Sequence, residues 1–137
     1  MAYKIFLDTN ILIDFIEQRS FDKESVNELF KMAEKNDIEI FISESVITTA
    51  LYVTKNTAQI ERVLKIASVI CIKETEIKTA LSSSFKDKEN AILYYGSLHA
   101  KIDFFITRNE KDFAKNSLTQ LTVLNAKALV AKLKAPK

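Results

Sequence analysis

The chain has 137 residues, of which 47% are hydrophobic and 28% are charged, and its formal net charge is +2. This composition is typical of one globular domain and excludes a disordered chain. No apolar run approaches the ~20 residues that cross a bilayer, and the start lacks the apolar stretch of a signal peptide. The single cysteine, Cys71, excludes an intramolecular disulfide. We therefore expect a cytoplasmic protein without a membrane partner.

Short apolar runs typical of buried strands alternate with helical patterns along the chain. In chain order, the sequence predicts a strand at 3–7, helices at 11–18 and 23–35, a strand at 38–42, helices at 44–54 and 58–68, a strand at 69–72, helices at 76–84 and 88–101, strands at 104–107 and 121–124, and a helix at 126–134. This alternation predicts an α/β fold. We expect a single-domain α/β/α sandwich over residues 1–134, with a central, mainly parallel five-stranded sheet and a tail at 135–137.

Asparagines stand where a chain with one glycine needs turn and cap residues. Asn36 and Asn116 each follow a helical pattern, and asparagine tolerates the left-handed conformation that usually favours glycine. Asn125 precedes the last predicted helix and is a candidate N-cap. The asparagines therefore have a structural interpretation before a functional one.

The scarcity of glycine, histidine and cysteine excludes several kinds of site. Gly96 lies inside a predicted helix, so neither a glycine-rich dinucleotide turn nor a P-loop can form. One histidine and one cysteine cannot make a zinc site within one chain, so any metal must be held by oxygen ligands. A Ser-His-Asp site would need His99, but no glycine-flanked elbow presents a serine. We expect His99 at a helix surface and Cys71 as a small core residue.

The first predicted strand ends at Asp8-Thr9-Asn10. Open α/β sheets bind ligands at the carboxyl ends of their strands, so Asp8 is the first candidate for a site residue. The simpler interpretation is that Asp8 caps the helix that follows. A phosphatase that uses Asp8 as its nucleophile would need a second aspartate two residues on, where this chain has Asn10.

Three segments together resemble the PIN domain family: Ile5 to Phe15, Asp87-Lys88-Glu89-Asn90-Ala91, and Asp103 to Phe113, which contains Thr107-Arg108-Asn109. They span essentially the whole chain in the family's order and spacing. The resemblance implies a Mg²⁺- or Mn²⁺-dependent endoribonuclease that hydrolyses RNA phosphodiesters. It also implies the toxin of a bacterial toxin–antitoxin pair, with a cognate antitoxin protein and a second copy of the chain as partners.

The family holds its metal with three or four acidic residues at the edge of the sheet, because Mg²⁺ and Mn²⁺ take oxygen ligands. Asp8 matches the first acidic position and Asn10 the polar residue after it, whereas Thr49, Asn90 and Asn109 stand at the other three positions. On this resemblance the catalytic set is Asp8, Asp87, Glu89, Asn90, Asn109 and Asp112; the metal ligands are Asp8, Asp87 and Asn90; and the substrate-binding residues are Asn10, Thr49, Thr107 and Arg108.

Only one of the four matched positions is a carboxylate, so we expect weak metal binding and slow catalysis. Asp87, Glu89 and Asp112 are the acids near enough in sequence to compensate. The alternative is a catalytically degenerate domain that binds RNA or a protein.

Several of these residues also have structural interpretations. Asp87 precedes a helix and is a candidate N-cap. Arg108 could grip a phosphate or form an ion pair with Asp112 or Glu110. A set of aromatic and leucine side chains is expected in the core or in a subunit interface rather than stacked on bases, namely Phe15, Phe30, Leu51, Tyr94, Tyr95 and Leu98.

Overall fold

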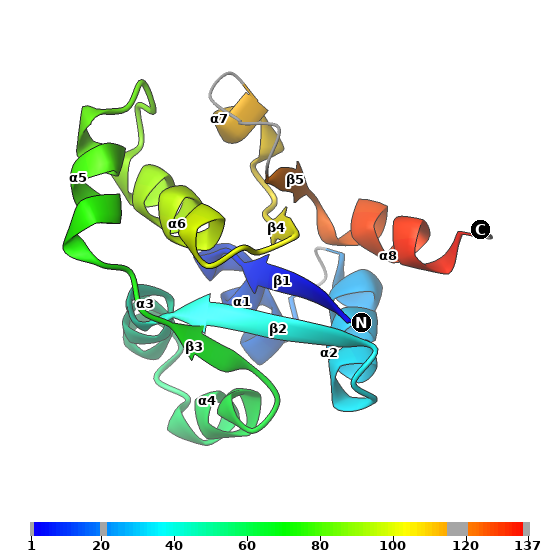
Figure 1. The fold of residues 1–137 in the computed structure, drawn as a ribbon. Helices are drawn as coiled ribbons and strands as arrows, with labels where there is room; N and C mark the ends of the chain where they lie inside the picture. The colour runs from blue at the N-terminus through cyan, green and yellow to red at the C-terminus, as the bar shows by residue number, and fades with distance from the viewer. Residues whose placement is uncertain (1, 20–21, 115–120, 136–137) are drawn as a thin grey trace.

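The computed structural model describes residues 2–19, 22–114 and 121–135, and Figure 1 shows the arrangement of their strands and helices. The strands are β1 (Tyr3–Leu7), β2 (Ile38–Ser43), β3 (Ser68–Ile70), β4 (Phe104–Ile106) and β5 (Thr122–Leu124). The helices are α1 (Thr9–Glu17), α2 (Lys23–Glu34), α3 (Glu44–Thr54), α4 (Thr57–Leu64), α5 (Glu74–Ser82), α6 (Lys88–His99), α7 (Glu110–Ala114) and α8 (Ala126–Lys134).

The strands form one five-stranded sheet in the order β3-β2-β1-β4-β5, and every neighbouring pair is parallel. β1 is the central strand, and its Ile5, Phe6 and Leu7 are fully buried. A strand that is covered on both faces takes a continuous apolar run, which is the pattern of this segment. The predicted α/β fold with a parallel five-stranded sheet is therefore confirmed.

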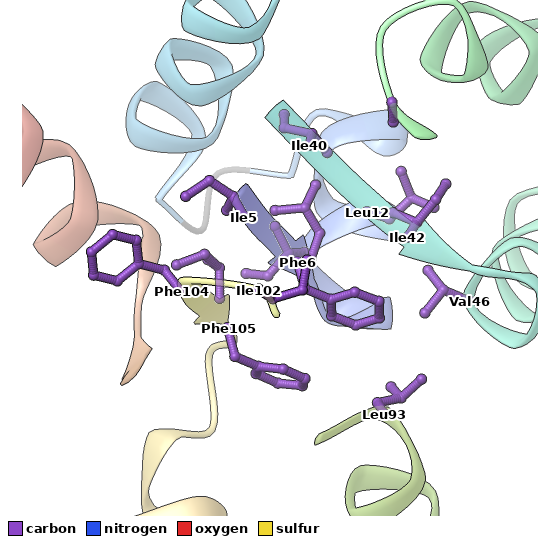
Figure 2. Packing of buried hydrophobic residues seen from close by; sticks show 14 of the residues in the cluster. Ile5, Phe6, Leu12, Ile40, Ile42, Val46, Leu93, Ile102, Phe104 and Phe105 are labelled. Carbon is purple, nitrogen blue, oxygen red and sulfur yellow. The ribbon is translucent and has the colours of Figure 1, made fainter. Parts of the chain in front are cut away.

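Side chains of the sheet pack on both of its faces. Phe6 and Phe105 lie in register on β1 and β4, and their rings stack at 5.3 Å. Figure 2 shows these rings on the side of the sheet that faces Leu93 of α6, whereas Ile5 and Ile40 point to the other side. Successive side chains of a strand alternate between faces, so β1 contributes to two hydrophobic layers. These two layers fix the position of the sheet and, with it, the carboxyl ends of its strands.

Most elements begin or end within two residues of the predicted position, but the helix predicted at 58–68 ends at Leu64, and two other differences affect the site or the core. α1 begins at Thr9 instead of residue 11, because Asp8 caps its first turn. β3 pairs with β2 only as far as Ile70, so Cys71 leaves the sheet and is exposed. The expectation of a buried Cys71 was wrong, because β3 is a short edge strand and the apolar run of the sequence continues past its last pairing.

The predicted turn and cap asparagines can be checked at two positions. Asn36 has a left-handed φ of 63° after α2, and the Asn125 side chain accepts from Ala128 N at 2.7 Å. Both predictions are confirmed. The turn expected at Asn116 lies outside the described residues, and the short helical pattern expected before it corresponds to α7.

Core and surface follow the expected pattern in and around α6. Gly96 lets α6 lie close to Ile72, which follows β3, since a Cβ at position 96 would meet the Ile72 side chain at 2.6 Å. Tyr94 is buried, and His99 is exposed at the end of the helix. Phe30 is buried as well, and four partly buried residues pack against the same core, namely Phe15, Leu51, Tyr95 and Leu98. Within the described part of the chain, no helix has the length and apolar character needed to span a membrane.

Candidate functional site

The register of β1 and β4 places Asp8 beside Thr107. Leu7 pairs with Ile106, so the next residue of each strand follows at the same edge of the sheet. The Asp8 backbone N–H donates to Ile106 O at 2.9 Å, and the Thr107 hydroxyl donates to Asp8 Oδ2 at 2.8 Å. Two residues from opposite ends of the chain are thereby joined at the carboxyl edge.

Asp8 also caps α1, as the simpler interpretation predicted. Its Oδ1 accepts from Thr9 N at 2.8 Å while its Oδ2 accepts from Thr107. Asp8 is 5% exposed and Thr107 is 0% exposed. A carboxylate with a hydrogen bond to each oxygen is held in one orientation. The N-cap of α1 and the first candidate site residue are therefore the same side chain.

Burial raises the pKa of Asp8 above its ordinary value, because desolvation disfavours the charged form. The hydrogen bonds from Thr107 and Thr9 act against this and lower the pKa. The Asp87 carboxylate raises the pKa of Asp8, and the Arg108 guanidinium lowers it. The site thus contains a nearly buried carboxylate with a second acid and a cation close enough to act on it.

Asp87 begins α6 and confirms its predicted capping role. Its side chain accepts from Asn90 N at 3.1 Å, and Asp87 itself is exposed. Asn90 is half-buried, and Glu89 is exposed on the first turn. The charge of Asp87 acts on Asp8 although Asp87 caps the helix. Of the acids near the start of α6, Asp87 is therefore the one that the electrostatics connect to Asp8.

Arg108 forms a different ion pair from the two that were predicted. Its Nε lies 2.9 Å from Asp14 Oδ2, whereas Glu110 accepts a hydrogen bond from Asn125 Nδ2 at 2.8 Å. Asp14 lies in the middle of α1 and is 3% exposed. The ion pair expected with Asp112 or Glu110 was wrong, because the fold brings Asp14, which is remote in sequence, against Arg108.

Sequence reasoning did not select Asp14. A signal was present, since this acid interrupts the apolar run from Ile11 to Ile16. A charged residue inside an otherwise apolar helix is rarely fully buried unless it is paired.

Among the remaining predicted residues, Asn109 is linked to Asp8 through Thr107. Asn109 N donates to the Thr107 hydroxyl at 3.1 Å, so Thr107 links the turn after β4 to Asp8. The Asn109 and Asp112 side chains are exposed. Asn10, on the first turn of α1, and Thr49, on α3, are half-buried. Thr107, predicted to bind substrate, is fully buried and donates a hydrogen bond to Asp8.

The oxygen-bearing side chains near Asp8 fit only a weak site for a divalent cation. Among residues 2–19, 22–114 and 121–135, no three His, Cys, Asp or Glu side chains come together as a group that could hold a metal ion. The charge of Asp87 acts on Asp8, and Asn90, on the first turn of α6, is a further residue with an oxygen that could bind a cation. Mg²⁺ can be bound by one or two carboxylates together with substrate phosphates. The residues present therefore suit a cation that is shared with a bound phosphate.

Comparison with known proteins adds a family match and three similar chains. The model of the family described as "PIN domain" matches residues 4–111. Ribonuclease VapC1 of Aquifex aeolicus (strain VF5) is 23% identical over 130 residues, which cover 87% of this chain and 90% of that protein. A toxin–antitoxin complex from Klebsiella pneumoniae contains a chain with a TM-score of 0.64 and 24% identity, covering 89% of this chain and 97% of that one. The crystal structure of VapBC2 from Rickettsia felis, bound to a DNA fragment from their promoter, contains another with a TM-score of 0.60 and 18% identity, covering 89% and 98%.

Proposed function

Because the chain belongs to the PIN domain family, we propose that it is an endoribonuclease that hydrolyses RNA phosphodiesters with the help of Mg²⁺ or Mn²⁺. The observation that carries the proposal is Asp8, a nearly buried carboxylate held from both sides at the carboxyl edge of the sheet. The 23% identity to Ribonuclease VapC1 over most of both chains supports the choice of RNA as substrate.

Each side chain of the site has a separate role in this proposal. Thr107 and Thr9 fix the direction of the Asp8 carboxylate and, through their hydrogen bonds, lower its pKa toward the ionised form. Arg108 neutralises a phosphate of the RNA beside Asp8, since a guanidinium matches phosphate oxygens well. Asp8 and Asp87, with the amide oxygen of Asn90, would hold Mg²⁺ or Mn²⁺, which when bound stabilises charge on the phosphate.

The exposed acids and amides take lesser roles. Glu89 and Asp112 add negative charge to the rim of the site, and Asn109 joins the rim to Asp8 through Thr107. Asn10 and Thr49 are proposed substrate-binding residues because both are half-buried and retain some exposed surface. Their single substitutions to alanine are expected to weaken RNA binding without abolishing cleavage.

A second candidate function rests on the shortage of carboxylates. Of the four positions matched to the family's acidic residues, only Asp8 is a carboxylate, since Thr49, Asn90 and Asn109 stand at the others. The described residues contain no group of three acids that could hold a metal. An amide oxygen ligates a cation without neutralising its charge. On this alternative, the domain binds RNA or a protein and has lost hydrolysis.

Manganese titration and RNA cleavage would separate the two candidates. The wild type is compared with Asp8→Ala and Asn90→Asp, and exposed Asp37→Asn serves as the control for a lost surface charge. The enzyme hypothesis expects slow, Mn²⁺-dependent cleavage that Asp8→Ala abolishes, Asp37→Asn retains and Asn90→Asp accelerates. Equal absence of cleavage in the wild type and Asp8→Ala would favour the binding module, and RNA binding without cleavage would establish it.

An antitoxin protein and a second copy of the chain are the partners that we propose. The chains of similar fold come from VapBC2 and from a toxin–antitoxin complex, which supports a toxin role with a protein inhibitor. A cytoplasmic location follows from an RNA target in the cell. Expression that stops growth, and recovery on co-expression of the adjacent gene, would support the toxin role. Sedimentation of the purified chain at dimer mass would support the homodimer.

A further inference from the structure

Asp14 is a buried acid for which the proposed reaction has no use. It lies on α1, is 3% exposed, and stands between two cations. Arg108 Nε is 2.9 Å from one of its oxygens, and Arg19, from the end of the same helix, is 3.7 Å from the other. Within the described residues, neither oxygen of Asp14 accepts a hydrogen bond. Charge attraction is therefore what holds this acid.

A buried ion pair of this kind is weak support for the fold. Burial raises the pKa of Asp14, and the charges of Arg108 and Arg19 lower it, while Glu17 and Asp22 add repulsion. Replacing a buried ion pair with apolar residues often leaves a protein equally stable or more stable. The position of the pair offers a better explanation, because it connects the middle of α1 to the edge of β4.

One member of the Asp14–Arg108 ion pair, Arg108, belongs to the candidate active site. Arg108 follows Thr107 directly, and Thr107 donates to Asp8. With its Nε against Asp14, the Arg108 side chain remains 25% exposed and its charge lowers the pKa of Asp8. Asp14 therefore contacts the buried Nε of Arg108, while part of the same side chain reaches the surface, and its charge is close enough to act on Asp8.

We propose that Asp14 is a positioning residue that anchors Arg108 through Nε, so that the guanidinium meets an RNA phosphate beside Asp8. This inference rests on the proposed function. Arg19 lies near the other carboxylate oxygen of Asp14 and forms a second ion pair with Glu17, at 2.7 Å. Asp14 itself does not touch the substrate, and it acts through Arg108 alone.

The anchoring can be tested without RNA. In ¹⁵N-labelled protein, the Arg108 Nε–Hε signal, assigned by its loss in Arg108→Lys, is expected to be protected from solvent exchange. Asp14→Asn keeps the shape of the side chain but removes the charge, so this protection should be lost. Glu17→Gln is the matched control, because it breaks the neighbouring ion pair and leaves Asp14 with Arg108. Protection that survives in Asp14→Asn would overturn the proposal.

RNA binding then tests the consequence. Fluorescence anisotropy with a single-stranded RNA should show Arg108→Gln and Asp14→Asn each about tenfold weaker than the wild type, the loss expected for one charge-assisted hydrogen bond. The double variant should be no weaker than either single one, and Glu17→Gln should bind as the wild type does. Losses that multiply in the double variant would overturn the proposal.

Two further outcomes are also decisive. If Asp14→Asn fails to fold, Arg108→Lys tests the same arrangement, since lysine keeps the charge but has a single ammonium, which cannot face Asp14 with one nitrogen and a phosphate with others. Undiminished RNA affinity in Arg108→Lys would contradict the proposal. A wild type that binds no RNA would contradict the proposed function, and the Nε–Hε measurement would still decide whether Asp14 anchors Arg108.

Discussion

Replacing Thr107 with valine should separate the electrostatic support of Asp8 from simple packing. Valine has nearly the shape of threonine, and Thr107 is 0% exposed, so the core stays filled. The substitution removes the hydroxyl that donates to Asp8 Oδ2 at 2.8 Å and accepts from Asn109 N at 3.1 Å. The Asp8 carboxylate then keeps only its hydrogen bond from Thr9.

The expected loss of stability follows from these two bonds. A hydrogen bond to a charged group contributes about 2 kcal/mol and a neutral one about 1 kcal/mol. Burying a methyl group in place of the hydroxyl returns about 1 kcal/mol. Thr107→Val should therefore lower the free energy of unfolding by about 2 kcal/mol at pH 7. At pH 4 the loss should be smaller, and it should approach about 1 kcal/mol once Asp8 is protonated, because a protonated carboxyl group accepts a weaker bond.

Urea unfolding at the two pH values measures both quantities. Thr107→Ser is the control, because it keeps the hydroxyl and loses one methyl group, for about 1 kcal/mol at either pH. Equal losses for Thr107→Val at pH 7 and pH 4 would show that the hydroxyl does not support a charged Asp8. The folded-state pKa of Asp8 should also rise further in Thr107→Val, since one of the bonds that lower it is gone.

Three other substitutions test the remaining features of the fold. The pKa of Asp8 is raised in the folded state, so its contribution to the free energy of unfolding is fully present below its ordinary pKa of 3.8 and is lost as the pH rises through the folded-state pKa. Asp8→Asn should therefore unfold at a higher urea concentration than the wild type at pH 7. A lower urea midpoint would contradict this. Gly96→Ala places a Cβ 2.6 Å from the Ile72 side chain and should lower the free energy of unfolding by about 1 kcal/mol, after its gain in helix propensity is counted. In a double-mutant cycle measured by thermal unfolding, adding Ile72→Ala should remove this unfavourable contact. Asn125→Ala removes the cap of α8 and should cost about 1 kcal/mol in urea unfolding, whereas Asn125→Asp should retain most of the stability.

Local patterns in the chain were sufficient for the kind and order of the helices and strands and for the position of Asp8 at the end of the first strand. The run from Tyr3 to Leu7 predicts a buried strand, and the acid that follows it marks the carboxyl edge. The capping roles of Asp87 and Asn125 depend on one helical turn, which a sequence displays directly. Such features concern neighbours along the chain, so periodicity and residue type determine them.

Tertiary structure alone decided which distant residues meet. Thr107 supports Asp8 because the register pairs Leu7 with Ile106, and no local pattern records that register. Arg108 pairs with Asp14 for a similar reason, since α1 packs beside the end of β4. The sequence by itself therefore determined the parallel α/β alternation and the place of Asp8. Strand order and helix packing, which depend on contacts between remote segments, decided what surrounds it.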